Sequence, residues 1–89
     1  MIEVAAPIVN RLGLHARAAA KLVHLASTFD SDVLIISNGE EVDAKSILGV
    51  LLLAAAQGMT VTVRASGPDE KEAMDAILAL IANRFGEES

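Results

Sequence analysis

The chain has 89 residues and a formal net charge of −5, contains no cysteine, and only 2% of its residues are aromatic. Disulfides and thiolate metal sites are therefore excluded, and an acidic chain with few aromatic rings is a poor partner for nucleic acid. Hydrophobic residues make up 53% of the sequence, which is enough for a small aliphatic core. We expect a single domain over residues 1–89, too small to enclose a substrate cavity.

No segment has the pattern of a membrane span or an export signal. The longest apolar run, residues 47–56 interrupted only by Gly49, is far shorter than the roughly 20 residues that a span needs. Residues 1–4 lack the basic region that precedes the apolar stretch of a signal peptide. A cytoplasmic protein without a membrane partner is the expectation.

A change in apolar period predicts the first two elements. Residues 2–8 alternate apolar side chains with others, which is typical of a half-buried strand, and Pro7 favours an edge position. From residue 16 to residue 29 the period becomes helical, with one apolar face. The opposite face of this helix consists of Arg17, Lys21, His24 and Thr28.

The middle of the chain predicts a hairpin and a second helix. Residues 33–36 are a short β-branched run, and Asn38-Gly39 behind them is a strong hairpin signal because both positions accept positive φ. A short charged strand over residues 40–43 should complete the hairpin. Ser46 is well placed as the N-cap of a helix that we expect to continue to Gly58.

The last part of the chain predicts a strand and a third helix. Residues 59–65 alternate with one wet face, and Gly67-Pro68 precedes an acidic first turn that suits the positive end of a helix dipole. The order of elements is then β-α-β-β-α-β-α. Such a pattern predicts an α/β (α+β) fold, an open-faced β-sandwich with three helices on one face of a four-stranded antiparallel sheet.

His15 lies where a loop becomes the first helix, as its N-cap or within one residue of it. Backbone N–H groups at a helix start lack intrahelical acceptors, so the position suits an anion. A neutral imidazole is a good nucleophile, and the Arg17 guanidinium offers a planar fork of donors to phosphoryl oxygens. From spacing alone, a plain helix cap beside a solvated cation is an equally good interpretation. His15 and His24 have no third partner in the pattern, so a metal site is not expected.

The segment Gly13-Leu14-His15-Ala16-Arg17, together with Lys45-Ser46-Ile47 at a second helix start, resembles the HPr family. HPr is the histidine-containing phosphocarrier of the bacterial phosphoenolpyruvate-dependent phosphotransferase system, and it has nitrogen-related paralogues. The resemblance covers essentially the whole chain and implies a carrier, not an enzyme, with no cofactor. It implies that His15 takes a phosphoryl group on Nδ1 from Enzyme I, that Arg17 supports it, and that a IIA protein receives it.

One position departs from the family pattern, which usually has proline after the arginine, where this chain has Ala18. Alanine is a good helix former, so the helix should persist, but the fixed φ of proline is lost. Ala18 favours the alternative of a regulatory binding module, controlled at Ser46, in which transfer through His15 is vestigial. A third interpretation is an unrelated open-faced domain that binds a partner through its second helix.

The serine matching Ser46 is phosphorylated in many family members by an ATP-dependent HPr kinase/phosphorylase, and residues 45–49 match that context. The resemblance thus implies a possible regulatory phosphoserine, on a residue that also serves as a helix N-cap. A phosphate there would add roughly −1.5 to −2 charges.

The second helix is apolar all round, so a short helix on an open-faced domain should leave part of it exposed beside His15 as a partner patch. We expect about half of its candidate residues to fill the core instead. The protein is expected to act as a monomer. The predicted partner surface consists of Ala16, Ala20, Lys21, His24, Ile47, Leu48, Leu51 and Leu52.

Overall fold

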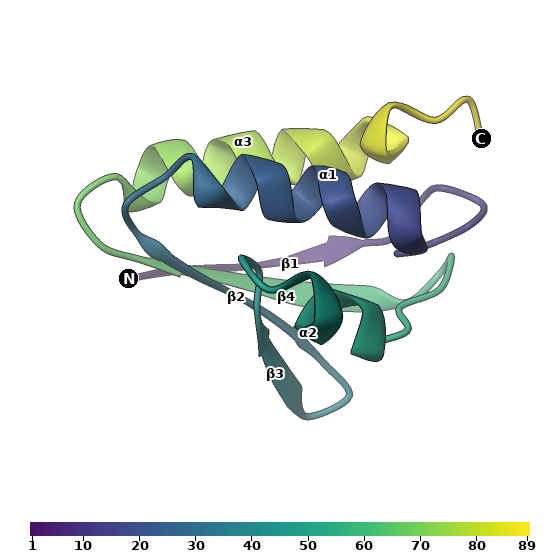
Figure 1. The fold of residues 1–89 in the computed structure, drawn as a ribbon, viewed down its shortest axis with the longest axis horizontal. Helices are drawn as coiled ribbons and strands as arrows, with labels where there is room; N and C mark the ends of the chain where they lie inside the picture. The colour runs from purple at the N-terminus through teal and green to yellow at the C-terminus, as the bar shows by residue number, and fades with distance from the viewer.

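The computed structural model describes residues 1–89 and has the predicted order of elements (Figure 1). A short 3₁₀ turn that was not predicted follows the last helix. The elements are β1 (Ile2–Pro7), α1 (Ala16–Ser27), β2 (Asp32–Ser37), β3 (Glu40–Asp43), α2 (Ile47–Leu52), β4 (Thr60–Ser66), α3 (Glu70–Ala82) and η1 (Arg84–Gly86).

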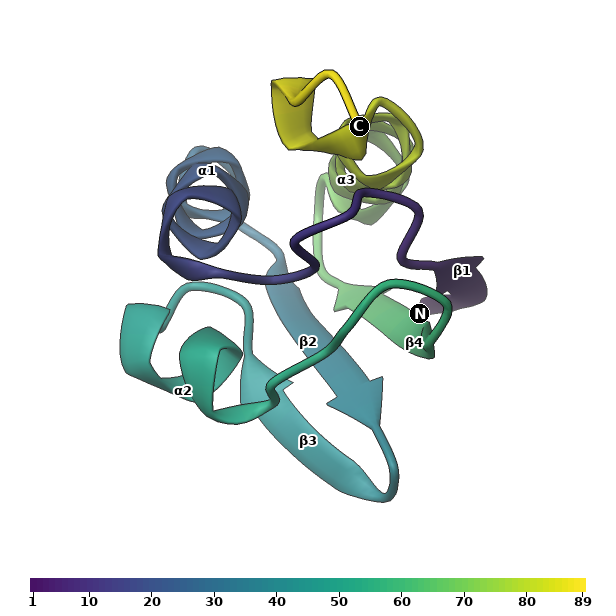
Figure 2. The same cartoon turned by 90° about the vertical axis from the view of Figure 1, so that its right-hand side faces the viewer.

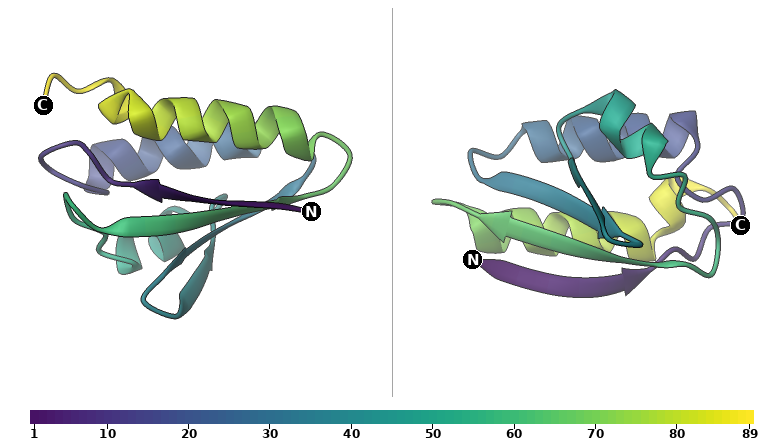
Figure 3. Two further views of the ribbon diagram at one scale, coloured as in Figure 1. Left: turned by 180° about the vertical axis from the view of Figure 1, so that it is seen from behind. Right: turned by 90° about the horizontal axis from the view of Figure 1, so that it is seen from below.

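The four strands form one antiparallel sheet in the order β1-β4-β2-β3. Strand β1 pairs only with β4, from Ile2 opposite Ala65 to Pro7 opposite Thr60, so it is an edge strand, as Pro7 predicts. All three helices lie on one face of this sheet, and the other face carries none (Figures 2 and 3). The open-faced sandwich predicted from the sequence is confirmed.

The core lies between the sheet and the helices. The alternation in β2 and β4 directs Val33, Ile35, Val61 and Val63 inward, and each is fully buried. They belong to one cluster of 21 buried residues, to which α1 and α3 contribute their apolar faces. Burial of one such side chain stabilises the fold by about 1.5–3 kcal/mol. The cluster gives α1, and hence His15 at its start, a fixed support.

Helix α2 is shorter than expected, because it ends at Leu52 and not near Gly58. Ala54 has a φ of 50°, a left-handed conformation that a helix cannot continue through. The turn brings the carbonyl of Ala55 to the backbone N–H of Leu14, at 2.9 Å. The local helix propensity of residues 54–56 is thus overridden by a contact with the loop before α1.

The chain reverses after α3, where residues 84–86 all have positive φ. Phe85 is fully buried and anchors the turn. As a result, residues 87–89 run beside the loop between β1 and α1 (Figures 1 and 2). The backbone N–H of Arg11 in this loop donates to the carbonyl of Ser89 at 3.0 Å. The end of the chain is therefore next to His15.

Candidate functional site

His15 is the N-cap of α1, as predicted, with an extended backbone conformation (φ −73°, ψ 178°). Its Nδ1 accepts a hydrogen bond from the backbone N–H of Arg17 at 3.3 Å, so this nitrogen faces the first turn of the helix. The side chain is 26% exposed, which leaves the ring within reach of another molecule. Nδ1 therefore has a lone pair directed to the helix start, where an anion is favoured.

The other ring nitrogen of His15 contacts a residue that was not among the predicted site residues. Nε2 is hydrogen-bonded to Oε2 of Glu87, 72 positions further along the chain. Oε1 of Glu87 accepts a hydrogen bond from Nδ2 of Asn10 at 2.8 Å. That bond holds the pKa of Glu87 below its usual value. His15 and Arg17 lower the pKa further by smaller amounts, whereas partial burial opposes the shift. The carboxylate is accordingly ionised at neutral pH.

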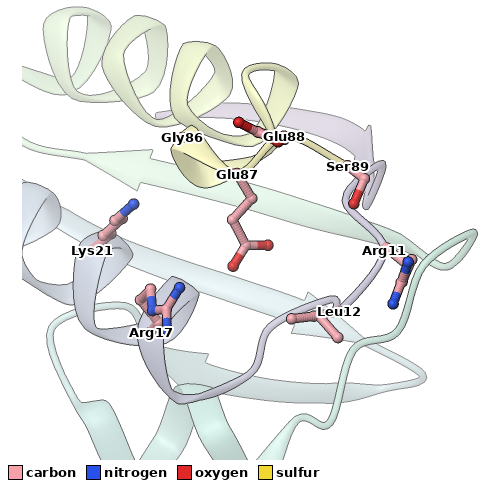
Figure 4. A pocket seen from close by; sticks show the side chains of 8 residues that line it. All are labelled: Arg11, Leu12, Arg17, Lys21, Gly86, Glu87, Glu88 and Ser89. Atoms are coloured by element: carbon pink, nitrogen blue, oxygen red, sulfur yellow. The ribbon is translucent and has the colours of Figure 1, made fainter.

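A pocket of about 390 Å³ is lined by Glu87, the residue that contacts the His15 ring (Figure 4). The Glu87 side chain points into it from the end of the chain, with Arg17 and Lys21 on one side and Arg11 on the other (Figure 4). Of these three cations, the two arginines have no hydrogen bond from their side chains and can offer donors to phosphoryl oxygens. The residues lining the pocket are Arg11, Leu12, Arg17, Lys21, Gly86, Glu87, Glu88 and Ser89.

Arg17 is exposed on the first turn of α1, two residues after His15. Its guanidinium makes no hydrogen bond or ion pair within the chain, whereas the ammonium of Lys21 donates to the carbonyl of Phe85 at 2.7 Å. The Arg17 side chain is thus free to turn toward an anion on Nδ1. Lys21 instead ties α1 to the reversal that brings Glu87 to the site.

The loop that presents His15 is held from two sides. Gly13 has a φ of +64°, and a Cβ there would lie 2.4 Å from the carbonyl oxygen of Ala55. The side chain of Asn10, fully buried, donates to the carbonyl of Gly13 at 2.8 Å. Helix α1 begins normally with Ala18 in its first turn, as expected, where the side chain is fully buried.

Ser46 is the N-cap of α2, as predicted, and its hydroxyl accepts a hydrogen bond from the backbone N–H of Gly49 at 3.2 Å. The residue is half-buried, and its oxygen is already used as a cap. Helices α1 and α2 pack against each other, so Ser46 and His15 begin two neighbouring helices.

All eight residues of the predicted partner surface are exposed. The expectation that about half of the α2 residues fill the core is wrong: Val50 provides the buried side of the helix, and Leu53 follows it. A helix of six residues packs one side only, which leaves its other large side chains in water. Their exposed fractions are Ile47 43%, Leu48 65%, Leu51 37% and Leu52 68%.

His24 is exposed in the last turn of α1, as its place on the polar face predicts. No cluster of three or more His, Asp or Glu side chains able to hold a metal ion occurs in the structure. None of the helices is both long enough and apolar enough to cross a membrane.

Sequence reasoning did not identify Asn10 and Glu87 as site residues. Gly86 after the third helix is a typical signal for a helix end in the left-handed conformation, and it could have indicated the reversal. Phe85, the one large apolar residue after Ile81, could have indicated an anchored tail. The sequence contains no signal for the partner of the tail.

Comparison with known proteins agrees with this geometry. A family model described as the PTS HPr component phosphorylation site matches residues 2–83. Phosphocarrier protein HPr of Cupriavidus necator is 62% identical over 87 residues, which cover 98% of this chain and 98% of that protein.

Solved structures give the same result. The crystal structure of HPr-C-His from Thermoanaerobacter tengcongensis has a TM-score of 0.96 and 45% identity, with 100% of both chains covered. A structure titled as an HPr dimer from the same organism has a TM-score of 0.79 and 45% identity, covering 98% of this chain and 100% of that one. The chain therefore belongs to the HPr family, the phosphocarrier proteins of the phosphotransferase system, which carry a phosphoryl group and are not enzymes.

Proposed function

We propose that His15 accepts a phosphoryl group on Nδ1 from phosphorylated Enzyme I, with phosphoenolpyruvate as the ultimate donor, and passes it to IIA proteins or domains. The observation that carries this proposal is the orientation of the His15 ring. Its Nδ1 is unprotonated, and the lone pair accepts only the long hydrogen bond from the N–H of Arg17, at 3.3 Å, which a phosphoryl group can replace, while Nε2 is engaged by Glu87. Nδ1 is thus the nitrogen that an incoming phosphorus atom can reach.

Transfer requires an in-line displacement. The Nδ1 lone pair forms the new bond to phosphorus as the bond to the donor breaks, and the leaving group on the donor takes that electron pair. Charge spreads over the three equatorial oxygens, which the N–H groups at the helix start and the Arg17 guanidinium stabilise. The same steps in reverse pass the group to the acceptor. The pocket is open to solvent, so a partner protein that docks over it can bring its own phosphorylated or acceptor residue to His15.

The exposed apolar side chains of α2, with the neighbouring row Ala16, Ala20, Lys21 and His24 of α1, form the surface that we propose for docking of Enzyme I and IIA proteins. Large apolar side chains in water beside the reacting residue are typical of a site that a partner covers. We further propose that the protein works as a monomeric carrier in the cytoplasm, built as one domain over residues 1–89.

Ser46 is proposed as a regulatory site, phosphorylated by an HPr kinase/phosphorylase. A dianionic group there would lie at the start of α2, directly before Ile47 and Leu48 of the docking surface. Docking would then have to desolvate a new charge, which opposes binding. Phosphorylation at Ser46 should therefore reduce transfer to His15 without involving the His15 ring itself.

The test is incubation with phosphoenolpyruvate and Enzyme I. The wild-type chain should acquire one acid-labile, base-stable phosphoryl group, and His15→Ala should abolish it. His24→Ala, which removes an exposed histidine from the same helix, should keep the full extent of labelling. Labelling that persists without His15 would contradict the carrier proposal, and labelling of Ser46 alone by a kinase would support the regulatory alternative.

A further inference from the structure

We propose that Glu87, held in place by Asn10, is a positioning residue for phosphoryl transfer, whose carboxylate keeps the His15 ring proton on Nε2 and leaves Nδ1 free to attack. This inference deepens the proposed function and rests on it. Glu87 lies outside residues 2–83, the part of the chain that the family model matches.

The carbonyl of Gly13 can only accept a hydrogen bond. The Asn10 side chain must therefore turn its NH₂ group toward this carbonyl, at 2.8 Å. The same NH₂ group donates to Oε1 of Glu87 at 2.8 Å. A flipped Asn10 amide would direct its oxygen at two acceptors, so its orientation is fixed.

The side-chain oxygen Oδ1 of Asn10 is buried and has no hydrogen-bond partner in the structure. Leaving such an oxygen unpaired costs free energy. We infer that this cost is offset by the two hydrogen bonds that the NH₂ group of the same side chain donates. Its two donated bonds, to Gly13 and to Glu87, join the loop before α1 to the end of the chain. Asn10 thus orients the carboxylate that meets His15.

The direction of the next hydrogen bond follows from charge. An ionised carboxylate can only accept, and the pKa of Glu87 is lowered chiefly by the Asn10 hydrogen bond. His15 Nε2, in contact with Oε2 of Glu87, must therefore hold the proton and donate it. Nδ1 accepts a hydrogen bond from the N–H of Arg17 and is therefore the unprotonated nitrogen. Each ring nitrogen has one role.

The carboxylate also acts during the transfer itself. When Nδ1 forms its bond to phosphorus and the donor takes the electron pair of the broken bond, the proton stays on Nε2 and the ring becomes positive. The ionised Glu87 facing that N–H stabilises this charge. The buried aspartate of a Ser-His-Asp triad stabilises its imidazolium in the same way.

The substitution Glu87→Gln tests the proposal, because it keeps the size of the side chain and reverses one hydrogen bond. The Asn10 NH₂ group still needs an acceptor, so the Gln oxygen should face Asn10 and the Gln NH₂ group should face His15. Nε2 must then accept, which moves the ring proton to Nδ1 and breaks the hydrogen bond from the N–H of Arg17 to that nitrogen. We expect ¹⁵N NMR of the His15 ring to show this change of tautomer. The rate of transfer from Enzyme I should fall about tenfold, because the charge-assisted bond and the nucleophilic tautomer are both lost.

The matched control is Glu72→Gln, which removes the same charge from an exposed residue of α3 that does not line the pocket. This variant should keep the proton on Nε2. The proposal is overturned if Glu87→Gln keeps the proton on Nε2, or if this variant transfers within about twofold of the wild-type rate. Failure of the proposed function looks different: the wild-type chain itself would then not be phosphorylated at His15, whatever its tautomer.

Discussion

Ser31 and Asp69 exchange hydrogen bonds across the fold: the backbone N–H of Asp69 donates to the Ser31 hydroxyl at 3.0 Å, and the backbone N–H of Ser31 donates to the Asp69 carboxylate at 2.8 Å. The carboxylate also accepts from the N–H of Asp30 at 3.0 Å. The pair fixes the beginning of α3 to the turn after α1. This end of the molecule lies opposite the His15 site (Figures 1 and 3).

The first prediction concerns the acid stability of this pair. The hydrogen bond from the Ser31 hydroxyl, then that from the N–H of Asp30, lower the pKa of Asp69 against partial burial. A carboxyl group with a lowered folded-state pKa stabilises the fold above its ordinary pKa of about 3.9, and this contribution disappears as pH falls through the folded-state value. Asp69→Asn should therefore lower Tm at pH 7 and approach the wild-type Tm in acid. Thermal melts between neutral and strongly acidic pH measure the difference in Tm between variant and wild type. The control Asp75→Asn, on the exposed side of α3, should change Tm little at any pH.

The second prediction concerns Gly13, where a side chain would meet the backbone of residues 55 and 56. Gly13→Ala should destabilise the fold by more than about 1 kcal/mol, because it combines a positive φ with a steric clash. Gly58→Ala, with a φ of +88° and open space around the position, is the matched control for the backbone strain alone. Equal losses of unfolding free energy in denaturant titrations would show that the contact with the Ala55 carbonyl is unimportant.

The third prediction concerns Arg17, whose guanidinium has no partner within the chain. Arg17→Ala should slow transfer from Enzyme I and leave Tm nearly unchanged, since an exposed unpaired cation contributes little to stability. Lys71→Ala removes the same charge from an exposed position of α3 outside the pocket, together with a surface ion pair to Asp75 that contributes little, and should leave the transfer rate unchanged and Tm nearly so. A large drop in Tm with a normal transfer rate would make Arg17 a structural residue.

The fourth prediction separates the two roles of Ser46. Ser46→Ala removes the cap on the Gly49 N–H and should cost about 1 kcal/mol, or a decrease in Tm of about 4–8 °C for a domain of this size. Its transfer rate should be unchanged, because the docking surface keeps its charge. Ser46→Thr, which retains a capping hydroxyl, should preserve most of the stability.

Ser46→Asp should behave in the opposite way. Aspartate caps helices about as well as serine, so Tm should stay near that of the wild type. The new negative charge beside Ile47 should slow transfer from Enzyme I through repulsion and desolvation at the interface. Equal transfer rates for the wild type and Ser46→Asp would leave Ser46 as a helix cap and nothing more.

The sequence predicts those parts of this fold that depend on local pattern. The alternation in β2 and β4 determines which face is buried, so the inward valines and Ile35 follow directly from their spacing. The place of His15 also follows, since the apolar period changes one residue after it. These features depend on neighbours within a few positions, which a single sequence displays.

Contacts between distant segments could not be predicted. Helix α2 ends early because the Ala55 carbonyl bonds to Leu14, and nothing in residues 53–58 indicates that acceptor. The contact of Glu87 with His15 depends on the positive φ of residues 84–86 and on the burial of Phe85. Such contacts are decided by the packing of the whole chain, which overrides local propensity.

The pairing of β1 with β4 has a consequence for how the protein folds. Ile2 pairs with Ala65, and α1, the β2–β3 hairpin and α2 all lie between these two residues in the sequence. Closing so long a loop carries an entropic cost that no local contact offsets, and proteins with such distant pairings fold slowly. His15 lies between these two strands in the sequence, so the sheet beneath its helix is complete only when β4, made long after His15, has paired with β1.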